Sequence, residues 1–338
     1  MWRTVGHEKA INTLRRALGG GMLSHAYLFA GPRHVGKMTL ALDLARAVNC
    51  LEESADNRPC DDCNQCRRIA DGLHADIRVV GLEAQDSGTG RTRVNISIDQ
   101  VRRVQRDASL KPYEGAYRVF IFDGAERLSE EAANSLLKIL EEPPDRVILV
   151  LLGSSGGGML PTIVSRCQQM ELRPLPLSLV ARELETHHGA DPEKAEEIAR
   201  LSAGRLGWAV QAATEPELLE HRAERLATIE DTVRGGLEVR FSYAADLASV
   251  FSRDRNAARQ EVALWLDWWR DVMVIREGVP ELVGNLSRTE NLRAVAQSLS
   301  SAQIAAAINA IQRIAGYLER NVNPRLALEE LMLVLPRL

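Results

Sequence analysis

Four cysteines with the spacing of metal ligands follow a glycine-rich loop that contains a lysine. The loop reads Gly31-Pro-Arg-His-Val-Gly36-Lys37-Met38-Thr39, and the cysteines are Cys50, Cys60, Cys63 and Cys66. A short apolar strand precedes the loop and a helix-patterned stretch follows it, which is the order of parts in a phosphate-binding P-loop. The sequence therefore predicts a phosphate site and a metal site at the two ends of one helix.

The loop has most of the residues that bind phosphate. Gly31, Gly36 and Lys37 have the spacing G-x4-G-K, in which backbone N–H groups and a helix N-terminus bind phosphate oxygens. The Ser or Thr that would bind magnesium is replaced by Met38. Thr39, one residue later, is a further candidate nucleotide-binding residue, although a shift of about 100° around the helix should point it elsewhere. We expect ATP or ADP binding to be retained and magnesium-dependent hydrolysis to be weak. The alternative is a glycine turn that no longer binds nucleotide.

A second apolar strand, residues 119–122, ends in Asp123. That position predicts a carboxylate at the carboxyl edge of a parallel sheet, where phosphates and magnesium bind. In hydrolysing relatives of such a P-loop the next residue is a Glu that polarises the attacking water, whereas this chain has Gly124. Glu126 is expected to begin another turn. The alternative for Asp123 is a turn residue that only ends the strand.

The four cysteines offer enough thiolates to close a tetrahedral zinc site, and a closed site has a structural role. Iron–sulfur binding is the competing interpretation, but a ferredoxin-type run would continue with a cysteine where this chain has Ala70. Unliganded thiols are the third possibility. The fifth cysteine, Cys167, is expected to be a small buried apolar residue.

Composition indicates an ordinary globular protein. The 338 residues are 45% hydrophobic and 26% charged, with a net charge of −4, so two or three domains and no overall basic field are expected. No apolar run reaches the roughly 18 residues that span a membrane, and no signal-peptide pattern is present. The clustering of cysteines favours a metal over disulfides in a reducing compartment. We therefore expect a cytoplasmic protein without a membrane partner.

The apolar pattern predicts alternating strands and helices in the first half of the chain. Such alternation indicates a parallel sheet covered by helices. The expected strands are 26–30, 77–80, 118–123 and 147–152, and the expected helices are 7–19, 37–48, 98–109 and 129–142. Residues 84–95 are polar and are expected to form a mobile loop. Beyond the linker Arg173-Pro-Leu-Pro176 the pattern is helical, over 178–213 and 216–338.

Several segments together resemble the AAA+ clamp-loader subunits of bacterial DNA polymerase III, and most closely the delta-prime subunits. Besides the P-loop and the cysteines, the resemblance rests on Ile98-Asp-Gln-Val-Arg102, on Asp123-Gly-Ala-Glu-Arg-Leu128 and the helix up to Pro143-Pro144, on Leu160-Pro-Thr-Ile-Val-Ser-Arg-Cys167, and on Asn321-Val-Asn-Pro-Arg-Leu-Ala-Leu-Glu-Glu330. It covers nearly the whole chain.

The resemblance implies an α/β AAA+ domain with a P-loop, a parallel sheet and an inserted zinc module, followed by an all-α lid and an all-α collar. It places the AAA+ domain at 1–175 with the zinc module at about 50–70, the lid at 176–214 and the oligomerising collar at 215–338. It also implies that the chain is a component of the DNA polymerase III holoenzyme, with weak or no ATPase activity of its own.

The implied activity is the loading of the sliding clamp on primed DNA. The resemblance implies that Arg166 acts as an arginine finger on the ATP of a neighbouring subunit. The implied partners are the gamma/tau motor subunits, the delta subunit and the sliding clamp, with primed DNA bound through the assembled loader. This chain would then be a stator.

Two other functions are open at this point. An ATP-hydrolysing gamma/tau-like motor would need hydrolytic residues at positions 38 and 124, and both are absent. A nucleic-acid repair ATPase of another AAA+ or RecA-like class is disfavoured by the collar-like C-terminal segment.

Overall fold

The structure, a computed structural model, describes residues 1–82, 95–154, 158–319 and 322–338. Residues 84–94 of the expected mobile loop lie outside these described residues. The chain divides into two compact units, Met1–Leu179 with Gly204–Trp208, and Val180–Ala203 with Ala209–Leu338. No helix among the described residues is both long and apolar enough to span a membrane.

The N-terminal unit is built on a parallel sheet of five strands in the order β2-β3-β4-β1-β5. The strands are β1 (Ala26–Ala30), β2 (Ile77–Val80), β3 (Arg118–Asp123), β4 (Val147–Gly153) and β5 (Gln168–Glu171). The helices are α1 (Glu8–Gly19), α2 (Lys37–Asn49), α3 (Asn64–Ala70), α4 (Ile98–Ala108), α5 (Glu130–Glu141) and α6 (Pro161–Val164), with 3-10 turns at Ala55–Asn57 (η1) and Ala125–Arg127 (η2).

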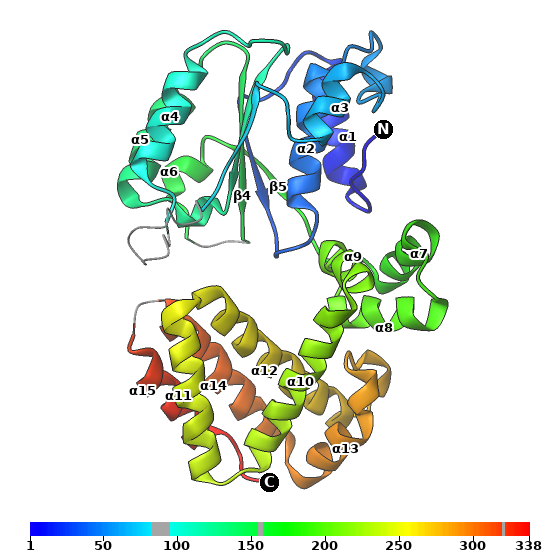
Figure 1. Cartoon of the computed structure of the whole chain (residues 1–338), viewed down its shortest axis with the longest axis vertical. Coiled ribbons are helices and arrows are strands. Elements are labelled where there is room, and N and C mark those ends of the chain that lie inside the picture. Colours follow the sequence, from blue (N-terminus) through cyan, green and yellow to red (C-terminus); the bar gives the residue numbers. More distant parts are fainter. Residues whose placement is uncertain (83–94, 155–157, 320–321) are drawn as a thin grey trace. The chain divides into compact units, whose positions relative to one another are not determined.

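Helices cover both faces of this sheet, α1 to α3 on one side and α4 to α6 on the other (Figure 1). Successive side chains of a strand point to opposite faces. Tyr27 and Phe29 of β1 therefore enter the core under α1 and α2, whereas Ala26 and Leu28 enter the core under α4 and α5. Burial on both faces explains the continuous apolar runs that predicted these strands.

The expected parallel sheet is confirmed, and the four predicted strands and four predicted helices of this unit are present with bounds within one residue. Ser129 caps α5 as its position suggested, since its side chain accepts a hydrogen bond from the N–H group of Ala132. The sequence did not predict β5. Only Met170 of that strand is buried, so this edge strand has no apolar run to reveal it.

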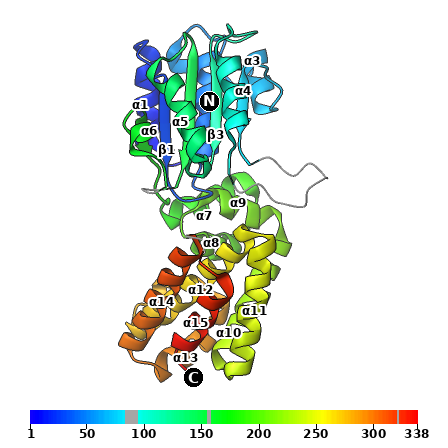
Figure 2. The same ribbon diagram turned by 90° about the vertical axis from the view of Figure 1, so that its left-hand side faces the viewer.

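From Leu177 on, the described residues form helices and short 3-10 turns without a strand. The core of the C-terminal unit holds Trp265, Trp268 and Trp269 of α12. Helices α10, α11, α13 and α14 pack against α12, and α15 packs against α11 and α14 (Figure 2). The helices are α7 (Leu177–His188), α8 (Pro192–Ser202), α9 (Leu206–Thr214), α10 (Pro216–Arg234), α11 (Leu237–Arg253), α12 (Arg255–Arg276), α13 (Thr289–Ser298), α14 (Ser301–Glu319) and α15 (Pro324–Val334), with 3-10 turns at Pro280–Leu282 (η3) and Leu286–Arg288 (η4).

A buried carboxylate fixes the loop that leads into β3. Asp76 accepts hydrogen bonds from the backbone N–H groups of Tyr113, Glu114 and Gly115 at 2.8 to 2.9 Å, and the Arg118 guanidinium lies 3.3 Å away. Burial alone would raise the pKa of Asp76, but these donors and this cation hold it below its usual value. The charged carboxylate is therefore part of the fold.

We expect Asp76→Asn to lower the free energy of unfolding by about 2–4 kcal/mol, because an amide offers one acceptor oxygen to three N–H groups. Amide hydrogen exchange at residues 113–115 and urea denaturation would measure this, with the exposed Asp145→Asn as control. The folded-state pKa is depressed, so the stabilisation is present at neutral pH and is lost as the pH falls through that value. Unchanged protection of these amides in Asp76→Asn would contradict the assignment.

Candidate functional site

The P-loop begins where β1 ends, between two neighbouring strands. The N–H group of Gly31 donates to the carbonyl of Gly153 at 3.1 Å, and the N–H group of Leu172 donates to Ala30 at 2.7 Å. A Cβ atom on Gly31 would lie 2.3 Å from the Leu172 carbonyl oxygen. Position 31 therefore requires glycine, for a close approach of two backbone segments.

Lys37 starts α2 and folds back on the loop. Its Nζ atom donates to the carbonyl oxygens of Gly31 and Pro32 at 2.6 and 2.7 Å. Burial lowers the pKa of Lys37, while the carboxylates of Glu126 and Asp123 oppose that shift. The structure thus places Lys37 on Gly31, with the Asp123 carboxylate close enough to act on its charge.

The loop is electropositive. Gly36 takes a left-handed conformation with φ 110°, which turns the chain into the N-terminus of α2. Burial and the positive charges of Arg33, Arg205 and Lys37 lower the pKa of His34. Three cations beside a helix N-terminus favour an anionic ligand.

The two residues after Lys37 point in different directions. Met38 packs against the hydrophobic core between the sheet and α1 and α2. Thr39 is exposed. The rotation of about 100° per residue that the sequence argument used accounts for this difference.

A carboxylate that the sequence argument assigned only to a turn lies near this site. Gly124 has φ 80° and leads into the 3-10 turn η2, which carries Glu126. The Oε2 atom of Glu126 is buried without a hydrogen-bond partner among the described residues, 3.6 Å from the Cβ position of Gly153. Since Gly153 pairs with Ala30, Glu126 lies beside the start of the P-loop. The glycine at position 124 was the only feature of the sequence that pointed to this turn.

Residues Gly204–Trp208 return to the P-loop, although they are distant in sequence. The N–H group of Gly207 donates to the His34 carbonyl oxygen at 2.8 Å. A Cβ atom on Gly207 would lie 2.9 Å from that same oxygen. Glycine at position 207 thus allows the start of α9 to contact the loop.

The four cysteines of the predicted metal site meet at the end of α2. Their Sγ atoms all lie within 4.8 Å of one another, so the group could hold a metal ion. Cys50 follows the last residue of α2, and Cys63 caps the N-terminus of α3, which contains Cys66. Backbone N–H groups of Cys60 and Cys63 donate to the Sγ atoms of Cys50 and Cys60 at 3.4 and 3.3 Å.

These N–H groups favour thiolates within the cluster. The hydrogen bond from Cys63 lowers the pKa of the Cys60 thiol to about 6, whereas burial raises the pKa of Cys50 and of Cys66. A metal ion would favour ionisation of all four thiols. The fifth cysteine, Cys167, is buried in the core on the other face of the sheet, as expected.

Arg166 lies in the short connection between α6 and β5, and its guanidinium contacts its own chain. Nη1 donates to the carbonyl oxygen of Thr162 at 2.9 Å and to the Ser165 hydroxyl at 3.4 Å. Nη2 forms an ion pair with Glu141 at 2.9 Å. The Arg166 side chain is 37% exposed, so part of it is open to a neighbouring molecule.

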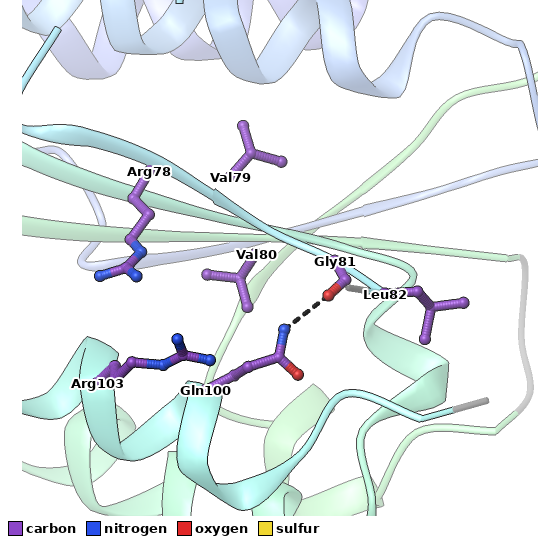
Figure 3. A pocket seen from close by; sticks show the side chains of 7 residues that line it. All are labelled: Arg78, Val79, Val80, Gly81, Leu82, Gln100 and Arg103. Carbon is purple, nitrogen blue, oxygen red and sulfur yellow. Dashed lines mark hydrogen bonds between the residues drawn. The ribbon is translucent and has the colours of Figure 1, made fainter. Parts of the chain in front are cut away.

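A separate cavity lies between the end of β2 and α4, and none of the predicted site residues lines it (Figure 3). Gln100 donates to the Gly81 carbonyl oxygen at 2.8 Å, and Arg78 pairs with Asp107 of α4. Arg103 also lines this cavity. The two arginines make its lining basic, and Asp107 neutralises the charge of Arg78.

Comparisons with known proteins cover both units. A family model described as DNA polymerase III, delta subunit, matches residues 6–176, and one described as DNA polymerase III, delta subunit, C terminal, matches residues 217–336. The DNA polymerase III subunit delta' of Bacillus subtilis is 29% identical over 99% of this chain and 98% of its own length. The tau subunit of Escherichia coli is 34% identical over 60% of this chain, but over only 30% of its own length.

Among solved structures, a Bacillus subtilis DNA clamp loader delta protein aligns over 96% of this chain and 99% of its own, with 15% identity and a TM-score of 0.35. That similarity is too low to bear on function. The family models and the nearly full-length match to delta' carry the assignment. The chain therefore belongs to the DNA polymerase III delta-subunit family, in which it is a delta-prime-like subunit.

Proposed function

We propose that this delta-prime-like clamp-loader subunit is a stator that hydrolyses little ATP itself and supplies Arg166 to the ATP site of a neighbouring motor subunit. It would do so while the loader places the sliding clamp on primed DNA. Its partners would be the gamma/tau motor subunits, the delta subunit and the clamp, with DNA bound through the assembled loader. The observation that carries the proposal is the accessible guanidinium of Arg166 on a well-packed base.

The packing around Arg166 supports a finger. Ile163 and Cys167 on either side of it are buried, at 1% and 9% exposure, so the backbone below the guanidinium is held in place. A positioned guanidinium stabilises the negative charge that develops on a transferred phosphoryl group. An exposed arginine held on a rigid base suits that role better than an arginine on a free loop.

The P-loop supports binding without efficient hydrolysis. Gly31, Gly36, Lys37 and Asp123 would bind ATP or ADP, whereas the magnesium-binding hydroxyl is replaced by the partly buried Met38, which packs against the core. Thr39, which the sequence assigned to the same site, is exposed on α2.

Zinc is the metal that the cysteine cluster would hold. Four thiolate ligands without an open position fit a structural Zn²⁺ site, since Zn²⁺ favours tetrahedral sulfur coordination. Bound zinc would tie Cys50 at the end of α2 to Cys63 and Cys66 of α3 and contribute folding free energy.

The finer layout is also a proposal. A lid at 176–214 and a collar at 215–338 would follow an AAA+ domain at 1–175, and the proposed role in replication suits a cytoplasmic location.

The stator role predicts negligible ATP turnover by the purified chain alone. Turnover in a mixture with motor subunits, delta, clamp and primed DNA should be stimulated, because hydrolysis then occurs on the motor subunits. A steady-state phosphate-release assay measures both. Substantial turnover by the chain alone that disappears in Lys37→Ala or Glu126→Gln would instead make this chain a motor.

Arg166→Ala should reduce hydrolysis about 100-fold or more at the ATP site that the finger serves, since it removes a transition-state contact. The stimulated ATP turnover of the whole loader would fall by at least the fraction that this site contributes. Assembly, measured by size-exclusion chromatography, should be unchanged. Arg173→Ala, an exposed arginine on the same stretch, is the control. Unchanged turnover in a normally assembled Arg166→Ala loader would remove the finger assignment.

Cys63→Ser should abolish zinc binding and lower the melting temperature by at least about 5 °C, because the site contributes folding free energy. Metal content by mass spectrometry and thermal unfolding are the measurements. Cys167→Ala is the control that should keep its zinc. An unchanged melting temperature in a metal-free Cys63→Ser protein would argue against a structural role.

A further inference from the structure

The ion pair between Arg166 and Glu141 joins two elements that are separated in sequence. Glu141 is the last residue of α5, and Arg166 follows α6. Nη2 of Arg166 lies 2.9 Å from Oε1 of Glu141, while Nη1 is bound to the Thr162 carbonyl oxygen at 2.9 Å. Both terminal nitrogens of the guanidinium are thus held by the chain itself, from two directions.

Glu141 is poorly placed to stabilise its own helix. A helix C-terminus carries partial negative charge and favours cations, yet α5 ends in Glu141 and is followed by Glu142. A carboxylate there raises the local negative charge and attracts a guanidinium. The ion pair is also open to solvent, since the Arg166 and Glu141 side chains are 37% and 50% exposed, and exposed pairs add little to stability. Folding therefore does not explain this contact.

The contact leaves part of the guanidinium available. Nε of Arg166 has no hydrogen-bond partner among the described residues. A guanidinium has five N–H groups in a planar fork, so the edge that holds Nε can bind a phosphate oxygen while Nη1 remains on Thr162 and Nη2 on Glu141. The two contacts thus orient the Arg166 side chain and leave its Nε–H group available for a ligand.

We propose that Glu141 is a positioning residue for the arginine finger, which rests on the proposed function of Arg166. A free arginine side chain has many rotamers, and restricting them before the reaction removes an entropic cost from the transition state. Glu141 itself contacts no substrate. It acts through the orientation of Arg166, with Thr162 as the second anchor.

The test is ATP turnover by the assembled loader with clamp and primed DNA, measured over a range of ATP concentrations. Glu141→Ala should lower kcat about 2- to 5-fold, the range expected for an exposed ion pair, with KM for ATP nearly unchanged. Glu141→Gln, which keeps an acceptor oxygen without the charge, should be intermediate. Glu142→Ala, which alters the adjacent exposed carboxylate, should behave like the unmodified protein.

A double-mutant cycle separates positioning from a structural role. In the Arg166→Ala background, Glu141→Ala should cause no further loss, because the residue that it orients is absent. An equal loss in both backgrounds, a kcat that stays unchanged or rises in Glu141→Ala, or a lower melting temperature or impaired assembly would each overturn the proposal. If Arg166→Ala itself leaves kcat unchanged, the finger assignment fails first, and that outcome is distinct from a failure of Glu141 alone.

Discussion

The pairing of β1 with its neighbours at the point where the P-loop begins is the constraint on which the candidate site depends. Gly31 donates to β4, and Leu172, just after β5, donates to Ala30. The first residue of the loop is therefore held between two backbone segments, close enough to exclude a Cβ atom. Because all five strands are parallel, their carboxyl ends lie at the same edge of the sheet. Asp123, the last residue of β3, therefore lies at the same edge as the P-loop.

The main elements could be predicted because their burial is regular. Strands buried on both faces appear as apolar runs in the sequence. Helix α5 was visible because Ser129 caps its start and prolines follow its end. The cysteine cluster was equally visible, since the spacing of ligands within about twenty residues limits the geometry strongly. The edge strand with Met170 was missed, because an edge strand with one buried side chain has no periodic signal.

Contacts between distant residues could not be predicted in the same way. Glu126 is near the P-loop because a left-handed glycine turns the chain back by one 3-10 turn, and the sequence alone indicates the turn but not its direction. Glu141 meets Arg166 because α5 and α6 pack side by side, which depends on the hydrophobic core between them. Both carboxylates look like ordinary surface residues in the sequence. Their positions depend on tertiary packing, which local patterns do not encode.

The cysteine cluster and the P-loop lie at opposite ends of helix α2. Helix α2 begins at Lys37, and Cys50 follows its last residue. Within that helix, buried Asp43 and Arg46 pair with each other, and Arg46 also pairs with Asp61 between the cysteines. A metal in the cluster would therefore fix the far end of the helix whose N-terminus lies at the proposed phosphate site. The proposed stator would still need that helix in place, because α2 forms the core on one face of the sheet, Ile163 and Cys167 beside Arg166 belong to the core on the other face, and β1 contributes to both. The cysteines thus suit a structural task better than a chemical one.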